Sequence, residues 1–269
     1  LLFMIAGIIF VLMYGFALLS FPGSFMQFQT FFDLFNFNAA LFIVTLGLCV
    51  VMIGGGIDIS VGAVCGLVTM ACAMLLESGM GNVWGALFLA LGIGLAFGLM
   101  HGYLIAYLEI QPFIITLAGM FFAQGLLTTL HKEPLNVTRP AFVALRNFTI
   151  EIPWLGTVNR LGVFIPCEIK PGVLVVVVLV LLYAVFMKWS RFGRNLYAVG
   201  GNRQSARMLG INVKQTIFCS YVICGLTAGI SGFVFLMTTG AGNIGNGALF
   251  EMKAIASNVM GGILLNGGV

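Results

Sequence analysis

The sequence has very few charged residues. Of its 269 residues only 7% are Asp, Glu, Lys or Arg, whereas 61% are hydrophobic, and a water-soluble domain usually carries about 25% charged residues. This composition excludes water as the solvent for most of the chain. In lipid every backbone N–H and C=O needs a partner within its own helix or a closed barrel. The apolar runs are long and do not alternate with polar residues, so they predict transmembrane helices rather than barrel strands.

The sequence also lacks the signatures of an enzyme. No Gly-Lys dipeptide occurs, which excludes a phosphate-binding P-loop, so ATP and Mg²⁺ are expected only on a partner ATPase. The two histidines, His101 and His131, come without further ligands at zinc-site spacing, and the cysteines lack that spacing too. We therefore expect no catalytic residue, no metal and no cofactor in this chain.

Eight hydrophobic segments follow one another, near residues 1–20, 39–53, 60–76, 83–108, 112–130, 172–190, 216–238 and 251–265. A membrane span needs about 20 apolar residues, so the second, third and last predict broken or partly inserted helices. The first lacks the basic region and cleavage site of a signal peptide, and we expect a helix whose start precedes residue 1. The predicted fold class is all-α: a polytopic transmembrane bundle that forms one permease-like domain over residues 1–269.

Two polar stretches predict the orientation of the bundle. Residues 188–214 hold six basic and no acidic residues, whereas residues 131–171 hold five basic and three acidic residues. Short loops rich in Lys and Arg mark the cytoplasmic side of a membrane. We therefore predict a cytoplasmic loop at 188–214, a periplasmic loop at 131–171 and a cytoplasmic N-terminus.

Glycine spacing predicts close packing inside the bundle. Four pairs lie four residues apart, a spacing that lets helix backbones approach one another, although some such pairs also arise by chance in a chain with 36 glycines: Gly62 and Gly66, Gly94 and Gly98, Gly98 and Gly102, Gly225 and Gly229. Residues 51–57 also resemble residues 259–263. Transporters often contain paired half-units with glycine-interrupted helices near the substrate path.

The stretch GGGIDISVG over residues 54–62 predicts a helix break at membrane depth. Each glycine weakens a helix by about 1 kcal/mol relative to alanine. Asp58 is the only charged residue between Asp33 and Glu77, and a carboxylate at this depth costs roughly 2.5–3.5 kcal/mol, which makes it functional or paired. Two interpretations remain open for Asp58: contact with the transported substrate, or capping of the helix that begins near Ser60.

Residues 198–213 predict a short cytoplasmic helix. Asn202 is a suitable cap. Ala206 and Gly210 share one helix face, and Arg203 and Arg207 share another. Such a helix can dock into the groove of a partner, or its arginines can simply follow the positive-inside rule.

These stretches resemble the ribose-type permease family of ABC importers. Residues 55–62 are similar to the family's GGIDLSVG block, with Ile59 in place of leucine. Residues 111–120, QPFIITLAGM, resemble its Pro-x-Phe-Ile-x-Thr-Leu-Gly stretch, and the match from Phe113 to Phe122 is most like the galactofuranose permease branch. Residues 192–202, FGRNLYAVGGN, followed by Ala206, resemble its cytoplasmic coupling loop.

The resemblance implies about ten membrane helices, of which the chain holds about eight, and a set of partners. Those partners are a second permease, identical or homologous, two ATPase subunits and a periplasmic sugar-binding protein. In the family the coupling loop docks on the ATPase, a role that falls here on Gly201, Asn202, Ala206, Leu209 and Gly210. Residues 203–205, Arg-Gln-Ser, stand where the family often has acidic and alanine residues, so the docking surface differs in charge.

The implied function is import of a monosaccharide, such as ribose or galactofuranose, by alternating access across the inner membrane. Asp58, Ser60, Thr116 and Gln124 are the candidate residues of the translocation path. A path needs only weak polar contacts so that the sugar can leave again. For Thr116 and Gln124, which share a helix face, interhelical hydrogen bonding is the alternative.

Two other function classes fit these residues less well. A secondary transporter driven by protons or sodium usually needs several buried ionisable residues, and only Asp58, His101 and Glu109 are available for that role. A membrane enzyme would need a nucleophile–base pair or a metal cluster, and the sequence shows neither. Co-purification with an ATPase separates the importer from both.

Overall fold

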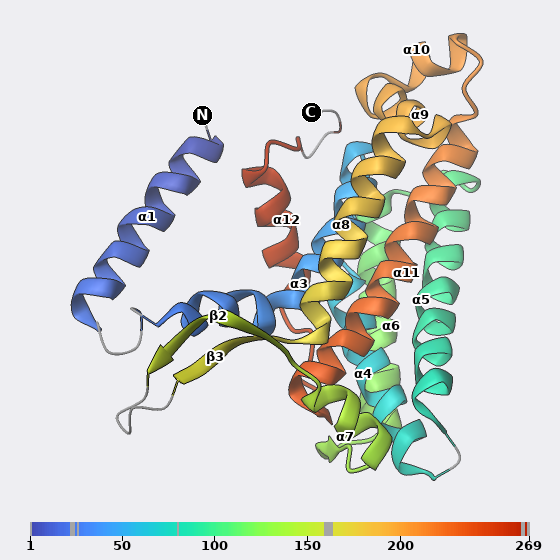
Figure 1. The fold of residues 1–269 in the computed structure, drawn as a ribbon. Coiled ribbons are helices and arrows are strands. Elements are labelled where there is room, and N and C mark those ends of the chain that lie inside the picture. Colours follow the sequence, from blue (N-terminus) through green and yellow to red (C-terminus); the bar gives the residue numbers. More distant parts are fainter. Residues whose placement is uncertain are drawn as a thin grey trace.

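A computed structural model describes residues 2–21, 25, 27–79, 81–158, 164–264 and 267, and the chain is helical over most of them (Figure 1). Five helices are long and apolar enough to cross a membrane: α3 Phe28–Ile53, α5 Val83–Ala106, α6 Pro112–Leu130, α8 Pro171–Trp189 and α11 Val213–Thr239. The apolar helices α1 Leu2–Ser20 and α4 Val61–Glu77 and the short helix α12 Phe250–Met260 accompany them. The predicted all-α polytopic bundle is confirmed, but the segment at 39–53, expected to be a broken or partly inserted helix, belongs to the 26-residue helix α3.

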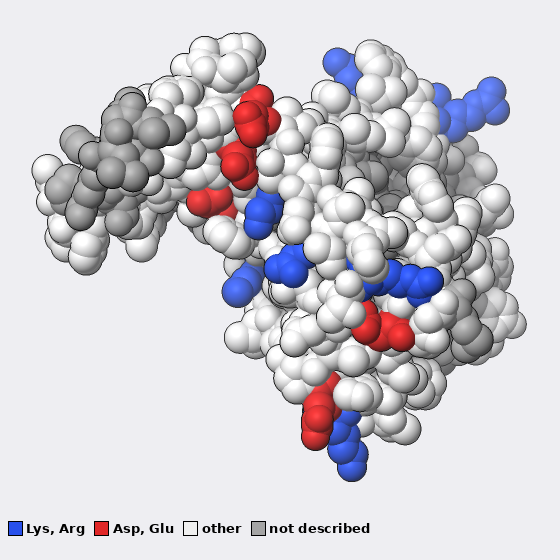
Figure 2. Space-filling view, turned by 60° about the horizontal axis from the view of Figure 1, so that its bottom comes forward, with Lys and Arg blue, Asp and Glu red and all other residues white. Residues whose placement is uncertain are grey.

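The two ends of the bundle differ in structure. At one end lie α9 Arg191–Gly201 and α10 Arg203–Met208, together with the first and last described residues (Figure 1). We call this the basic end. At the opposite end, the hairpin end, lie α7 Pro140–Asn147 and an antiparallel hairpin of β2 Ile150–Val158 and β3 Phe164–Ile169. Figure 2 shows acidic and basic side chains interspersed at this end. Arg160, one of the basic residues counted in the 131–171 stretch, lies outside the described residues.

Helix α3 begins earlier than the sequence predicted. The hydrophobic segment was expected from residue 39, but the helix starts at Phe28. Its first turns carry polar residues that lower the hydropathy, and these bind the backbone at the end of β3 and just after it. Gln29 donates to the Glu168 carbonyl (3.2 Å) and accepts from the Glu168 amide (2.7 Å), while Asn36 accepts from the Lys170 amide (2.9 Å).

Helix α11 lies at the centre of the bundle, and two-thirds of the residues in its apolar 18-residue stretch are buried. Its contact with α5 depends on glycine. A Cβ on Gly98 would lie 2.8 Å from the Tyr221 carbonyl oxygen, and one on Gly94 would overlap the Gly225 carbonyl oxygen. Real Cβ atoms essentially never approach so closely. The predicted close packing of these glycine pairs is therefore confirmed as backbone-to-backbone contact between α5 and α11.

Candidate translocation cavity and coupling segment

The segment that follows α11 turns back into the bundle. Gly240 ends α11 in the left-handed region (φ 74°), and strand β4 Ala241–Gly242 pairs with β1 Leu135–Asn136. Asn246 then donates one hydrogen bond to the Thr69 hydroxyl of α4 (3.1 Å) and another to the Ala241 carbonyl (2.9 Å). We call residues 240–249 the re-entrant loop. Backbone of this kind is tolerated inside a membrane only where protein or a water-filled cavity surrounds it.

Gly62 and Gly66 of α4 make room for this loop. A Cβ on Gly62 would lie 2.6 Å from the Gly247 carbonyl oxygen, and one on Gly66 would overlap the Asn246 carbonyl oxygen. The spacing of this pair predicted a neighbouring helix, but its neighbour is the re-entrant loop. Close packing was predicted correctly and the packing partner was not, because glycine spacing shows only that some backbone comes near.

A cavity of about 220 Å³ lies where the re-entrant loop meets α4, α6 and α12. Three of its lining residues have polar side chains that can form hydrogen bonds: Gln124, Asn246 and Glu251. The rest of the lining is small or apolar: Gly62, Ala63, Met120, Leu127, Ile244, Gly247, Ala248 and Leu249. Gln124 lies 12 residues after Pro112, which places the cavity about 18 Å along α6 at 1.5 Å per residue. A small polar molecule in this cavity would therefore sit within the hydrocarbon layer.

Glu251 is the acidic group of this cavity. Its residue is only 8% exposed, and it is the second residue of α12, which starts immediately after Leu249 in the left-handed region (φ 63°). The partial positive charge of a helix N-terminus stabilises a carboxylate there. The carboxylate lies against Gly62, where any larger residue would meet it. The cavity thus offers two amides and one carboxylate for hydrogen bonds to hydroxyl groups.

Of the four predicted path residues, only Gln124 lines the cavity. Thr116 is fully buried and donates to the Pro112 carbonyl of its own helix (2.9 Å). Asp58 and Ser60 are each 2% exposed and belong to the helix break. Sequence reasoning overlooked Asn246 and Glu251. Glu251 is the only acidic residue after Glu168 in this sequence, so the argument that singled out Asp58 would also have found it.

Asp58 organises the helix break between α3 and α4. One carboxylate oxygen accepts hydrogen bonds from the Ser60 amide (2.9 Å) and hydroxyl (2.6 Å). The other lies 3.8 Å from Nδ1 of His101 on α5. The Tyr221 hydroxyl donates to the Ile57 carbonyl (3.1 Å), so the break is also fixed to α11. These contacts favour the structural interpretation of Asp58 over direct contact with a substrate.

The two similar stretches, 51–57 and 259–263, form the same kind of helix end. After α3 the Gly55 amide donates to the Met52 carbonyl and the Gly56 amide to the Val51 carbonyl. After α12 the same pair of bonds recurs between residues 262 and 259 and between residues 263 and 258. In both ends a glycine has positive φ, 74° at Gly55 and 103° at Gly262. This pair of backbone hydrogen bonds is the Schellman motif, which favours glycine at the position with positive φ.

The coupling segment, residues 198–213, contains the predicted short helix. The Asn202 side chain accepts from the Ser205 amide (2.9 Å), which confirms Asn202 as the cap of α10. Gly201, Asn202, Leu209 and Gly210 are exposed, but Ala206 is 1% exposed and packs with Val199 and Val213. Ala206 thus supports the segment from within instead of forming its surface.

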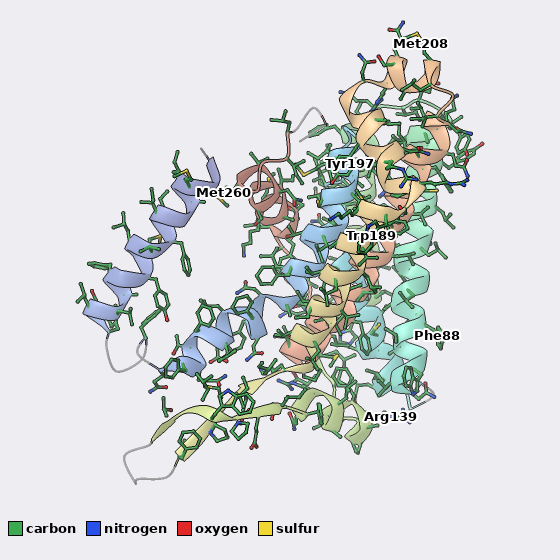
Figure 3. The ribbon with its side chains drawn as sticks, turned by 45° about the horizontal axis from the view of Figure 1, so that its top comes forward. Phe88, Arg139, Trp189, Tyr197, Met208 and Met260 are labelled. Atoms are coloured by element: carbon green, nitrogen blue, oxygen red, sulfur yellow. The ribbon has the colours of Figure 1, made fainter. Side chains whose placement is uncertain are left out.

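The outer tip of the coupling segment is apolar. Met208 and Leu209 are each 77% exposed, and Figure 3 shows Met208 at the far end of the molecule, pointing away from the bundle. Behind this tip, the Arg203 guanidinium donates to the Gly55 carbonyl (3.3 Å). The coupling segment is therefore bonded directly to the helix break.

Comparison with known proteins identifies the family. Residues 30–269 match the family described as branched-chain amino acid transport system / permease component. The inner membrane ABC transporter permease protein YjfF of Escherichia coli (strain K12) is 36% identical over 97% of this chain and 75% of its own length. The fructose import permease protein FruG of Bifidobacterium longum (strain NCC 2705) is 30% identical over 98% and 75%.

A third relative is the autoinducer 2 import system permease protein LsrC of Yersinia enterocolitica, which is 31% identical over 91% of this chain and 64% of its own length. No solved structure matches the sequence. The matches, together with the five apolar spans, show that the chain belongs to this ABC permease family and is a multi-pass transport subunit of the bacterial inner membrane, not an enzyme.

Proposed function

We propose that this protein is the permease subunit of an ATP-binding-cassette importer that carries a monosaccharide across the inner membrane through the cavity described above. The cavity of about 220 Å³ is the observation that carries the proposal. It has room for one small molecule. It combines amide and carboxylate groups with apolar side chains, which suits a sugar ring with hydroxyl edges and C–H faces. The import of fructose and of autoinducer 2 named for two relatives supports a sugar-like substrate.

Weak binding in the cavity fits a transport path. Glu251 accepts hydrogen bonds from hydroxyl groups, and the Gln124 amide can both donate and accept. Both N–H groups of Asn246 already bond to Thr69 and Ala241, so its carbonyl oxygen acts as an acceptor. Among the described residues that line the cavity few are polar and none is aromatic, so the sugar is held loosely enough to leave again. Selectivity then resides mainly in the periplasmic sugar-binding protein that delivers the substrate.

The orientation that we propose places the basic end in the cytoplasm. Residues 188–214 then form the cytoplasmic coupling loop, and residues 131–171 form the periplasmic loop on which the sugar-binding protein docks. Two ATPase subunits and a second permease complete the importer. The exposed Met208 and Leu209 at the tip of the coupling segment would insert into a groove of the ATPase.

A bonded route leads from the coupling segment to the cavity. Arg203 holds the Gly55 carbonyl, and Asp58 fixes the start of α4. Gly62, the second residue of α4, lies against Glu251 and the re-entrant loop. A displacement of the coupling segment during ATP hydrolysis would thus re-position α4 at the wall of the cavity.

Among monosaccharides, we propose that the substrate is a furanose, either galactofuranose or ribose. The resemblance of residues 113–122 to the galactofuranose permease branch supports this choice. The test is uptake into proteoliposomes that contain the permease, its ATPase and its binding protein, with labelled galactofuranose, ribose and fructose compared. We expect uptake that requires both ATP and the binding protein.

The role of the cavity is tested in the same vesicles. Glu251→Gln keeps the shape of the side chain and weakens its acceptor strength, so we expect uptake to fall about tenfold, the loss of roughly one charged hydrogen bond. Lys253→Gln is the control, because Lys253 is exposed on the same helix and does not line the cavity. Equal uptake by both variants would remove the cavity from the path, and uptake that follows an ion gradient without ATP would favour a secondary transporter.

A further inference from the structure

A second cavity, distinct from the translocation cavity, lies at the basic end. It has a volume of about 350 Å³ and opens between the α5–α6 connection and the start of α11. Its charged residues are Glu109, Arg203, Arg207 and Lys214, and its apolar wall includes Ile105 and Ile217. We call it the basic pocket. No residue of the translocation cavity takes part in it.

The basic pocket carries an excess of positive charge. Three cations and one carboxylate give a net charge of 3 − 1 = +2. Lys214 and Glu109 form an ion pair with 3.0 Å between Nζ and Oε1. This hydrogen bond, with the nearby charges of Lys214 and Arg207, lowers the pKa of Glu109, so its carboxylate remains ionised at neutral pH. Arg203 and Arg207 lie four residues apart on α10 and so share one face. Arg203 donates one of its N–H groups to the Gly55 carbonyl, so its other N–H groups and those of Arg207 remain to bind an anion.

The position of the basic pocket favours a lipid over a soluble anion. Its walls come from the last turn of α5, the first turn of α6 and the first turns of α11, so it lies where the helices leave the hydrocarbon layer. Two apolar residues beside it in sequence, Leu108 and Phe113, are 54% and 49% exposed. A ligand with a charged head and apolar chains would match the basic pocket and this apolar surface at once.

We propose that the basic pocket binds the phosphate group of an anionic phospholipid from the cytoplasmic leaflet. The arginine fork matches phosphate oxygens in geometry, and basic pockets between transmembrane helices on the cytoplasmic side are suited to anionic headgroups. The inference rests on the proposed orientation of the basic end but not on the identity of the sugar. A bound lipid would connect α10 to the α5–α6 connection and so hold the coupling segment at the membrane surface.

The test measures lipid binding without transport. Native mass spectrometry of the detergent-purified chain would compare added phosphatidylglycerol with phosphatidylcholine. The pocket variant is Arg207→Gln with Lys214→Gln. The control variant is Lys188→Gln with Arg191→Gln, which removes the same charge from the same stretch outside the basic pocket. Each basic side chain near an anionic lipid contributes roughly fivefold to affinity, so the pocket variant should bind phosphatidylglycerol about 25-fold more weakly.

The outcomes of this comparison decide the proposal. Selective binding of phosphatidylglycerol by the wild type and the control variant, lost in the pocket variant, would support it. Competition by inorganic phosphate would then show that the phosphate group alone is recognised, and its absence would show that the acyl chains contribute. Equal binding of both lipids, or equal loss in both variants, would overturn it. A pocket variant that keeps its lipid but no longer binds the ATPase would assign the basic pocket to the partner subunit. Failure of sugar uptake would not affect any of these readings.

Discussion

Replacing Gly62 by alanine is the sharpest test of how the cavity is built. The added Cβ would meet the Glu251 carboxylate and would lie 2.6 Å from the Gly247 carbonyl oxygen. A carboxylate at the end of a flexible side chain can move away, but the carbonyl belongs to the backbone of the re-entrant loop. The loop must therefore shift. Overpacking of this kind costs about 1–3 kcal/mol, and the shift would come at the expense of the cavity.

We expect Gly62→Ala to lower the free energy of unfolding by about 1–3 kcal/mol and to reduce sugar uptake more than tenfold, while assembly with the ATPase persists. Thermal unfolding in detergent, uptake in proteoliposomes and co-purification measure the three effects. The control is Gly92→Ala on α5, where a Cβ meets nothing within 4 Å. Because alanine favours helices by about 1 kcal/mol over glycine, this control should be neutral or slightly stabilising. A Gly62→Ala protein with unchanged stability and uptake would refute the tight contact between α4 and the re-entrant loop.

Three further predictions concern the helix break and the basic pocket. Tyr221→Phe leaves the half-buried Ile57 carbonyl without its donor, so we expect a loss of about 1 kcal/mol in unfolding free energy, measured by thermal unfolding, and no loss would contradict the hydrogen bond. Asp58→Asn keeps an acceptor for Ser60, so uptake should remain while stability falls, and abolished uptake would restore Asp58 to the path. The pKa of Glu109 is lowered from its ordinary 4.5, so its ion pair with Lys214 stabilises the fold above pH 4.5, and this stabilisation is lost as the pH falls through the lowered pKa. The difference in thermal unfolding midpoint between the wild type and Glu109→Gln should therefore vanish as the pH falls through that range. A difference that persists at lower pH would exclude the ion pair.

The membrane helices were predictable because each helix that crosses the hydrocarbon layer needs about 20 apolar residues. Such apolar runs are visible in the sequence, and the predicted segments recur as helices in the structure. The start of α3 was not predictable, because Gln29 and Asn36 lower the local hydropathy and their partners, the backbone groups of Glu168 and Lys170, lie more than 130 residues away in sequence. The hairpin itself was interpreted only as a polar loop. Hydropathy cannot show that polar side chains are paired with a distant backbone.

The candidate site was predicted only in part. Gln124 was found because it is a polar residue on an apolar helix, and Glu251 could have been found by the same reasoning. Asn246 could not, since its position in the cavity depends on the re-entrant loop folding back against α4. Likewise, the bond from Arg203 to Gly55 joins two stretches that the sequence singled out separately. Single residues with unusual chemistry are visible in a sequence, whereas the contacts that bring them together depend on the folded chain.

The backbone-to-backbone contact between α5 and α11 has an evolutionary consequence. In an ordinary core, an enlarged side chain on one helix can be offset by a smaller one on its neighbour. Gly94 and Gly225 approach through their backbones, so neither has a side chain left to shrink. A suppressor of a substitution here cannot arise at the facing glycine. It must arise at the larger residues that set the distance between the two helices, and the glycines should therefore change only in lineages where that distance has changed.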